Sequence, residues 1–507
     1  MSPFVSPFYV LYSQGMKTGF LAALAAYAAV LWAAGLAFRG GRRSGAAAGP
    51  EAFFLASRRL GAFRVAFSLC AAWIGAASLL VSTDEACRDG LSAAWIVGVP
   101  AVVTLLVLAA LAPRVRAASG ETLSGLMAAR YGRAAGGLTT GLVVWYMTVL
   151  AASQMAAAGP FLGTLLGAGP FAGLAVAAGI AVVYAAAGGL QAVARTHVVQ
   201  FGLLLAGIAA LVSSLAGRTT WGAVRAAAAA AGKTGYFDPL AGGGRNLLVA
   251  LSFVLAWTIS PVAWQRLQAA RGAGAARRGT LAAALLLGLF YAGIVVAGML
   301  FLPLFPDGGA GVPLVTRFAA LEAGRLVGGL VFVTVLAAIL STMDAALNAG
   351  AFALAGGVRG RDAAPSPASA PASPPVPSAR PLLRARLSTV ALAAAALLIA
   401  ARLGDVLRTL GLASAIMAEG LLVPGLAALF LKRRAPLAGL LALILGGGHA
   451  LAAFLGETGL RIVALPPWPR SLPLGVGLGA AGFLAGLAVE RLRARRLPPP
   501  RPAAPAA

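Results

Sequence analysis

Long apolar runs alternate with short polar segments along nearly the whole chain. The runs are about 20 residues long and rich in Ala, Leu, Gly and Val, and about 20 such residues let a helix cross a bilayer. This pattern predicts an all-α polytopic membrane protein. We expect thirteen spans, at residues 18–37, 62–82, 94–112, 136–158, 170–187, 197–216, 246–265, 280–303, 326–352, 386–403, 410–430, 436–455 and 471–489.

The composition agrees with this pattern and excludes most soluble classes. Hydrophobic residues make up 60% of the 507-residue chain and charged residues 11%, with a mean hydropathy of +0.89. A soluble domain has about 25% charged residues. The sequence has no phosphate-binding Gly-x-x-x-x-Gly-Lys-Ser/Thr loop, because Gly232-Lys233-Thr234 lacks the first glycine, and its two histidines and two cysteines form no metal-ligand pattern. We therefore expect neither an enzyme nor an ATP-driven pump.

The net charge of +26 follows from membrane topology. With the N-terminus outside, 28 of the 40 Lys and Arg residues fall in segments expected to be cytoplasmic. Lys and Arg resist translocation, so this bias sets the orientation of the spans. Of the acidic residues, four fall inside, eight outside and two, Asp344 and Glu419, within spans. Nucleic-acid binding therefore needs no separate hypothesis.

Two predicted spans carry a helix-weakening residue near the middle. Leaving out the first span, these are the first and sixth of the next ten, with Gly75 in Trp73-Ile74-Gly75-Ala76 and Pro261 in Thr258-Ile259-Ser260-Pro261. Proline removes a backbone donor and clashes with the preceding turn. Paired interruptions in corresponding helices of two halves indicate a transporter site at the membrane midplane. The alternative is that both residues serve helix packing.

The eighth of these ten spans carries the adjacent hydroxyls of Ser341 and Thr342, followed by Asp344. Such groups are costly within an apolar span unless they are satisfied. Oxygen donors suit a hard cation such as Na⁺. The alternative is that the hydroxyls bond the preceding helical turn or a neighbouring helix.

Five stretches, taken in order, resemble the sodium:solute symporter family, which includes proline, sugar, iodide and pantothenate symporters. Each stretch alone is weakly specific, whereas the ordered set covers about residues 50–490. The stretches are 53–60 leading into 71–76, 184–200 with its Gly188-Gly189 pair, Gln265-Arg266, 338–344, and 420–425 before 432–434.

The resemblance implies the leucine-transporter fold, in which two inverted repeats of five helices enclose the solute site. One extra N-terminal and two extra C-terminal helices would complete this chain. It also implies a Na⁺ site between core helices 1 and 8. Na⁺ is thus expected as the coupling ion, with H⁺ as the alternative and no organic cofactor. The implied Na⁺ ligands are the carbonyls of Ala71, Ile74 and Ala338 and the hydroxyls of Ser341 and Thr342.

The resemblance places the solute against core helix 1 and against the break in core helix 6. The residues implied are Trp73, Phe253, Trp257 and Pro261. Phe253 and Trp257 lie one helical turn apart, and packing or interfacial anchoring is the other interpretation of these aromatic residues. Gln154, within core helix 3, either lines the cavity or cross-links helices.

One position departs from the family pattern. Many members have Thr-Asp, with the Asp linked to Na⁺ transit, where this chain has Thr196-His197. Histidine titrates near neutral pH and supplies no permanent negative charge. The departure indicates weaker sodium dependence, proton involvement, compensation by Asp344, or a tolerated residue at a loop edge. His197 and Asp344 are therefore candidates for gating or coupling.

These assignments divide the chain into parts. The Pro/Ser/Ala-rich segment 362–383 is expected to be a disordered cytoplasmic linker within the second repeat. The parts are 1–50 (extra N-terminal span and cytoplasmic loop), 51–216 (first repeat), 217–245 (external loop), 246–431 (second repeat) and 432–507 (two C-terminal spans and a cytoplasmic tail).

The function expected is sodium-coupled symport of a small organic solute, such as an amino acid or carboxylate, into the cell by alternating access. The protein would be multi-pass in the inner (cytoplasmic) membrane, with its N-terminus outside and its C-terminus cytoplasmic. Its partners would be the solute and the lipid bilayer, with no nucleic acid and no obligatory protein partner. The alternatives are a symporter-like sensor or regulatory protein, or a proton-coupled or uncoupled transporter on the same fold.

Overall fold

The structure is a computed structural model that describes residues 14–36, 54–118, 122–167, 169–308, 311–322, 325–355, 379–401, 406–431, 433–457 and 465–496. Helices dominate this part of the chain, and its one β-type pairing is an isolated bridge between Leu60 and Ala270. The predicted all-α class is confirmed.

The helices follow the apolar runs of the sequence. In chain order they are α1 (Gln14–Leu36), η3 (Ala56–Arg58), α3 (Ala62–Trp73), η4 (Ala77–Val81), α4 (Ser82–Asp89), η5 (Gly90–Trp95), α5 (Gly98–Ala117), α6 (Leu123–Tyr131), α7 (Arg133–Leu166), α8 (Pro170–Ala216), α9 (Trp221–Ala230), α10 (Gly243–Thr258), α11 (Pro261–Ala269), α12 (Ala273–Phe301), α13 (Leu314–Arg317), η6 (Phe318–Glu322), α14 (Arg325–Leu354), α15 (Ala379–Ala400), α16 (Val406–Ile416), η7 (Met417–Leu421), α17 (Leu422–Phe430), α18 (Pro436–Glu457) and α19 (Leu472–Arg496).

Eight helical segments in the described residues are long and apolar enough to cross a membrane, or nine if the bent pair α10–α11 counts as one span. The chain is therefore a multi-pass membrane protein. The expected number of thirteen spans is not confirmed. The spans expected at 170–187 and 197–216 form one helical element, α8, so Gly188 and Gly189 lie in helical backbone. A glycine inside a helix costs only about 1 kcal/mol.

The predicted linker 362–383 lies mostly outside the described residues. Its last residues belong to α15, which begins at Ala379, so the linker prediction extended too far at that end. Most of the N-terminal loop before residue 54 and the tail after 496 also lie outside the described residues.

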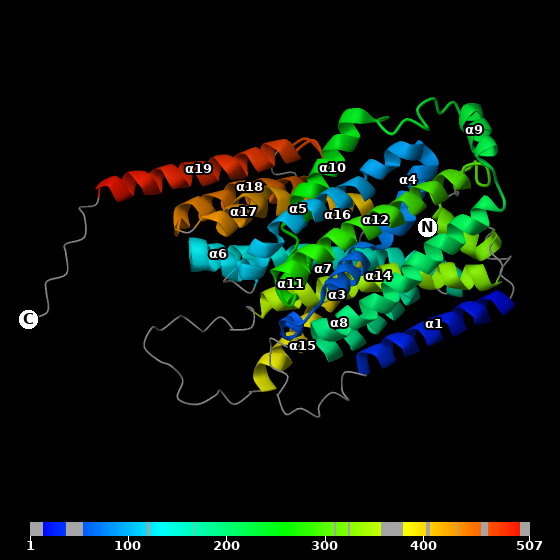
Figure 1. Cartoon of the computed structure of the whole chain (residues 1–507), viewed down its shortest axis with the longest axis horizontal. Coiled ribbons are helices and arrows are strands. Elements are labelled where there is room, and N and C mark those ends of the chain that lie inside the picture. The colour runs from blue at the N-terminus through cyan, green and yellow to red at the C-terminus, as the bar shows by residue number, and fades with distance from the viewer. Residues whose placement is uncertain are drawn as a thin grey trace, which may run out of the picture.

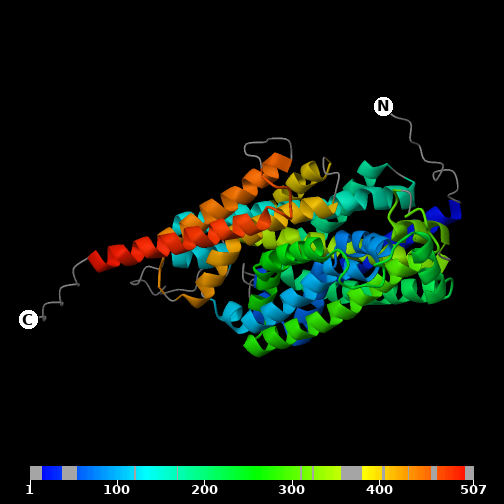
Figure 2. The same ribbon diagram turned by 90° about the horizontal axis from the view of Figure 1, so that it is seen from above.

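The helices form a single bundle whose two edges differ (Figure 1). α18 and α19 pack side by side along one edge and α1 lies along the opposite edge, with α3, α7, α8 and α14 between them (Figures 1 and 2). Small residues let α18 and α19 approach closely, because a Cβ on Gly486 would lie 2.4 Å from the Cα of Ala438.

Both predicted interruptions are present in the helices. α3 ends at Trp73, Ile74 is extended (φ −86°, ψ 90°), and the helix resumes after Gly75 with the π-helical η4. α10 and α11 meet at an angle of 42°, with Pro261 as the first residue of α11. Proline is tolerated there because the first N–H of a helix has no intrahelical acceptor.

Candidate functional site

The end of α3 lies against the middle of α14. The Ser341 hydroxyl donates to the carbonyl of Ala71 at 2.7 Å, with the Ala338 carbonyl at 3.2 Å. The last carbonyls of an α-helix have no intrahelical partner. Because α3 ends at Trp73, its last carbonyl oxygens are available to other partners beside α14. The Ser341 hydroxyl therefore lies within hydrogen-bonding distance of two of the other four predicted ion ligands.

The other two predicted ligands lie beside these three. Ile74 is the first extended residue after α3, and Thr342 follows Ser341 on α14. The Thr342 hydroxyl is buried and has no hydrogen-bond partner within the described part of the chain. Carbonyl and hydroxyl oxygens of this kind can hold a hard cation. The described residues contain no cluster of three or more His, Cys, Asp or Glu side chains that would hold a transition metal.

Gln154 of α7 joins the two halves of the broken helix. Its side-chain oxygen accepts from the backbone N–H of Ala76 at 2.7 Å, which satisfies a donor at the start of the second half. A Cβ at position 75 would lie 2.6 Å from the same oxygen. Glycine at that position therefore allows the amide to reach the backbone. Gln154 both cross-links helices and lines the cavity described next.

A cavity lies between the two helix breaks. It contains about 550 Å³ of space between atoms, part of it open to solvent. Trp73 and Trp257 form part of its wall, with ring centroids 5.6 Å apart. Its lining residues are Ala72, Trp73, Gly75, Ala77, Ser78, Val97, Tyr146, Leu150, Gln154, Trp257, Ser260, Val262, Thr342 and Leu410.

The predicted solute residues do not all line this cavity. Trp73, Trp257 and Gln154 do. Phe253 is fully buried behind Trp257, with the two rings stacked at 4.8 Å. Pro261 lines a second cavity instead. Phe253 therefore supports the wall of the cavity from behind.

Sequence reasoning missed Tyr146, Leu150, Ser78 and Ser260 as lining residues. A signal for two of them was present, because Tyr146 and Leu150 lie eight and four residues before Gln154 and so share its helix face. Ser78 connects the wall to α12: its hydroxyl donates to the Trp73 carbonyl at 3.2 Å and accepts from the Tyr291 hydroxyl at 2.8 Å.

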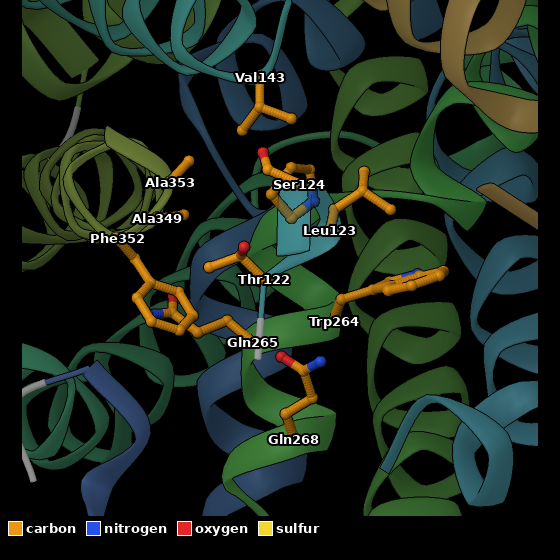
Figure 3. Close-up of a pocket in the computed structure, with 11 residues that line it drawn as sticks. Thr122, Leu123, Ser124, Val143, Trp264, Gln265, Gln268, Ala349, Phe352 and Ala353 are labelled. Atoms are coloured by element: carbon orange, nitrogen blue, oxygen red, sulfur yellow. The ribbon is translucent and has the colours of Figure 1, made fainter. Parts of the chain in front are cut away.

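The second cavity lies beyond the α10–α11 break, between α6, α11 and α14 (Figure 3). Gln265 projects into it from α11, and its amide nitrogen donates to the Phe54 carbonyl and to Asn348, each at 2.9 Å. The Gln265 oxygen and the Ser124 hydroxyl are buried and have no partner among the described residues. Pro261 and Trp264 line this cavity and Ser260 and Val262 the first, so α11 separates them.

A fully buried polar chain runs beside these cavities and joins four helices. The Arg266 Nε of α11 donates to the Ser68 hydroxyl of α3 at 3.0 Å. That hydroxyl lies 3.0 Å from Nδ1 of His197 in α8, and His197 Nε2 lies 2.9 Å from an Asp344 oxygen in α14. His197 Nδ1 also lies 3.1 Å from the Ser68 carbonyl, to which it donates when it carries the hydrogen. When Nε2 carries the hydrogen instead, each group of the chain donates to the next, from the guanidinium to the carboxylate. The Arg266 charge then balances that of Asp344.

This polar chain adjoins the oxygen cluster at the end of α3. Asp344 lies three residues after Ser341 on α14, and Ser68 lies three residues before Ala71 on α3. Residues three apart are neighbours on a helix surface. His197 and Asp344, both predicted as coupling candidates, therefore contact each other one helical turn from Ser341.

The match to known families is confined to the first two thirds of the chain. A model of the sodium:solute symporter family matches residues 53–359. This range includes both helix breaks, α8 and α14 and ends before α15. No curated protein sequence matches the chain.

Two of the solved structures that this chain resembles are symporters. One is a Na⁺-coupled sialic acid symporter in a substrate-bound outward-open state, with a TM-score of 0.73, 16% identity, and coverage of 94% of this chain and 97% of that one. Another is Mhp1, a nucleobase-cation-symport-1 family transporter with bromovinylhydantoin bound, with a TM-score of 0.53, 17% identity, and coverage of 88% and 95%. At these identities the likeness establishes the fold, which is that of leucine-transporter-like proteins.

Proposed function

The chain belongs to the sodium:solute symporter family, and on this premise we propose that it carries a small organic solute into the cell together with Na⁺. Membership of this family makes it a transport protein, not an enzyme. The observation that carries the proposal is the meeting of Ser341 with the Ala71 carbonyl at the end of α3, 2.7 Å apart. Na⁺ would replace this hydrogen bond with direct contacts to both oxygens.

The proposed Na⁺ ligands are the carbonyls of Ala71, Ile74 and Ala338 and the hydroxyls of Ser341 and Thr342. An ion held by α3 and α14 together stabilises the conformation in which these helices adjoin. Coupling arises because the ion binds one conformation better than the other. The unpartnered Thr342 hydroxyl, which also lines the cavity, supports this assignment.

We assign the solute to the cavity between the breaks, where Trp73, Trp257 and Gln154 would contact it. Phe253 would support the Trp257 ring, and Pro261 would fix the start of α11, which forms one side of the cavity. The aromatic walls and the amide suit a small molecule with one apolar face, such as an amino acid or a carboxylate. The cavity beyond α11 would receive the solute on the cytoplasmic side when α10 and α11 move. No organic cofactor and no obligatory protein partner enter this proposal.

We further propose that the chain crosses the inner (cytoplasmic) membrane thirteen times, with its N-terminus outside and its C-terminus in the cytoplasm. Nine segments qualify by length. One of them, Ala77–Ala117, would contribute to two spans, because its first part completes the broken helix that begins with Ala62–Trp73, and Thr18–Ala33, Pro170–Ile180 and Arg386–Ala400 would supply the other three. Residues 51–216 and 246–431 would be the inverted five-helix repeats, each beginning with a broken helix. Residues 1–50, 217–245 and 432–507 would be the N-terminal span, an external loop and the C-terminal helix pair.

Thermal stability in detergent tests the Na⁺ site. A ligand that binds only the native state raises stability by RT ln(1 + [L]/Kd). We expect Na⁺, but not K⁺ or choline at equal ionic strength, to raise the apparent Tm of the wild type. The Ser341→Ala/Thr342→Ala variant should lose this shift. The matched control is Thr139→Ala/Thr140→Ala, which removes an adjacent buried hydroxyl pair from α7 and should keep it. Loss of the shift in both variants, or in neither, would contradict the assignment.

Proton-coupled transport is the second candidate, and the contact of His197 with Asp344 favours it. These side chains lie 2.9 Å apart, fully buried, one turn from Ser341. A proton on His197 would add a positive charge beside the proposed Na⁺ site. Solute accumulation in vesicles driven by a pH gradient without Na⁺ would support this candidate. Accumulation driven only by a Na⁺ gradient would exclude it, and flux without accumulation would indicate uncoupled transport.

A further inference from the structure

A second histidine–carboxylate pair lies outside the region matched by the family model. Glu419 belongs to η7, the π-helical turn between α16 and α17, and His449 belongs to α18. The His449 Nδ1 lies 2.7 Å from a Glu419 side-chain oxygen. Glu419 is fully buried and His449 is 9% exposed. π-helical turns occur frequently at functional sites.

Glycines of the C-terminal helix pair make the space for this contact. A Cβ on Gly475 of α19 would lie 2.0 Å from the bonded Glu419 oxygen and 2.6 Å from His449 Nδ1. A Cβ on Gly446 of α18 would lie 2.0 Å from the backbone oxygen of Glu419. The carboxyl group is therefore enclosed by α18 and α19, which join the core of the bundle at this point.

The polar atoms on the far sides of the pair have no partner. Oε1 of Glu419 and Nε2 of His449 are both buried without a hydrogen bond to any described residue. A 2.7 Å contact between a ring nitrogen and a carboxylate oxygen requires a proton between them. If the ring is neutral and donates from Nδ1, the carboxylate keeps a full negative charge in apolar surroundings, which is costly.

No described charged group is placed to balance that negative charge. Glu419 and His449 form hydrogen bonds or ion pairs in the described residues only with each other. The described titratable groups on α7 are Arg133 and the Tyr146 hydroxyl, which is neutral at ordinary pH. Among residues whose side chains the structure describes, the charged ones on the elements packed against η7 are Arg133 on α7, Arg245 on α10, Glu457 on α18, and Glu490, Arg491, Arg493 and Arg495 on α19. Arg491, the first arginine of α19, lies sixteen residues beyond Gly475, about 24 Å along the helix, and Glu457 lies eight residues beyond His449, about 12 Å.

We propose that Glu419 and His449 form a binding site for one proton at the junction between η7 and the α18–α19 pair, separate from the ion and solute sites. The bound proton makes the pair neutral, either as an imidazolium beside a carboxylate or as an imidazole beside a carboxylic acid. In both forms Nε2 carries a hydrogen and a second hydrogen lies between Nδ1 and the carboxyl group. Loss of the proton leaves a bare Nε2 and a buried anion, which favours separation of η7 from α18.

Nitrogen NMR of protein labelled with ¹⁵N only at histidine tests this site directly, because the chain has two histidines. The His449→Asn variant assigns the signals by removing one set. We expect the wild-type His449 signals to show a hydrogen on Nε2 and a hydrogen-bonded Nδ1, unchanged between pH 6 and 9. A transition near pH 6.5, the ordinary range of histidine, or a bare Nε2 at pH 7 would overturn the proposal.

Two glycine variants of α19 provide a matched pair for the same measurement. Gly475→Ala places a methyl group against the Glu419 carboxyl group, whereas Gly477→Ala meets no atom within 4 Å. We expect Gly475→Ala to displace the carboxyl group and to give His449 an ordinary titration near pH 6.5, and Gly477→Ala to leave the signals as in the wild type. Equal spectra for the two variants would count against the site, because the proton would then not depend on the enclosure formed by α19.

Discussion

The two histidines of this chain each contact one of the two carboxylates that lie within the predicted spans, yet the two pairs balance their charge differently. His197 and Asp344 lie in the core, where Ser68 connects them to the buried guanidinium of Arg266. His449 and Glu419 lie at the edge, where no described cation contacts either side chain. When hydrogens run from Arg266 through Ser68 and His197 to Asp344, a permanent charge balances the first carboxylate, whereas no described cation contacts the second.

This difference predicts which pair changes its net charge when the pH changes. An arginine keeps its charge at all ordinary pH values, so the core pair can remain ionised without a bound proton. The edge pair changes its net charge whenever it releases its proton. The same two residue types can therefore act as a fixed structural link in one place and as a titrating site in another.

The largest expected effect is at Arg266. The Arg266→Gln variant should lose about 3–5 kcal/mol of stability, because removing one partner leaves the Asp344 carboxylate buried and unbalanced. The double variant Arg266→Gln/Asp344→Asn should recover part of this loss. The measurement is the apparent Tm of detergent-purified protein, together with the yield of monodisperse protein. A wild-type Tm for the single variant would show that Arg266 does not balance Asp344.

An intermediate effect is expected from alkaline pH at the edge pair. Above pH 7 the folded pair should hold one more proton than a carboxylate and a histidine in the unfolded chain, so stability should fall as pH rises, by up to about 1.4 kcal/mol per pH unit. Glu419→Gln has no proton to lose and should show a shallower fall in apparent Tm between pH 7 and 9. Asp344→Asn, the corresponding change in the core, should keep the wild-type slope. Parallel slopes in all three proteins would remove the distinction between the pairs.

The smallest effect concerns Na⁺ at low pH. Full burial and the nearby Arg266 guanidinium disfavour a proton on His197, so acidification to pH 5.5 should change the apparent Na⁺ affinity by less than about twofold, equivalent to less than about 0.5 kcal/mol of coupling. His449→Asn should leave this dependence unchanged. The readout is the Na⁺ concentration that gives a half-maximal rise in Tm. A dependence abolished by His449→Asn would assign the effect to the edge pair instead.

Much of the fold follows from the sequence because each apolar run specifies a helix locally. Gly75 and Pro261 mark the two breaks, since each changes the backbone at its own position. The adjacent hydroxyls of Ser341 and Thr342 were singled out because they are rare within an apolar span. These features depend on residue type and spacing within one helix.

Contacts between helices were much less predictable. His197 and Asp344 are 147 residues apart and Glu419 and His449 are 30 apart, and uniformly apolar helices do not show which faces meet. The same uncertainty left Gln154 with two interpretations and placed Phe253 in the cavity wall instead of behind it. The pairings depend on how neighbouring helices are rotated against each other, which small residues such as Gly475 decide.

Trp468, between α18 and α19, contacts α10, the first half of the broken α10–α11 helix. Its indole nitrogen donates to the Ser252 hydroxyl at 3.0 Å, and its ring lies 5.9 Å from that of Phe253. A Cβ on Gly411 of α16 would lie 2.5 Å from the same indole, so the ring is wedged between α10 and α16. If α10 tilts during transport, we expect α18 and α19 to move with it, because Trp468 connects them to α10. A fluorophore on the exposed end of α19 would then report the tilt of α10 before any transported molecule is known.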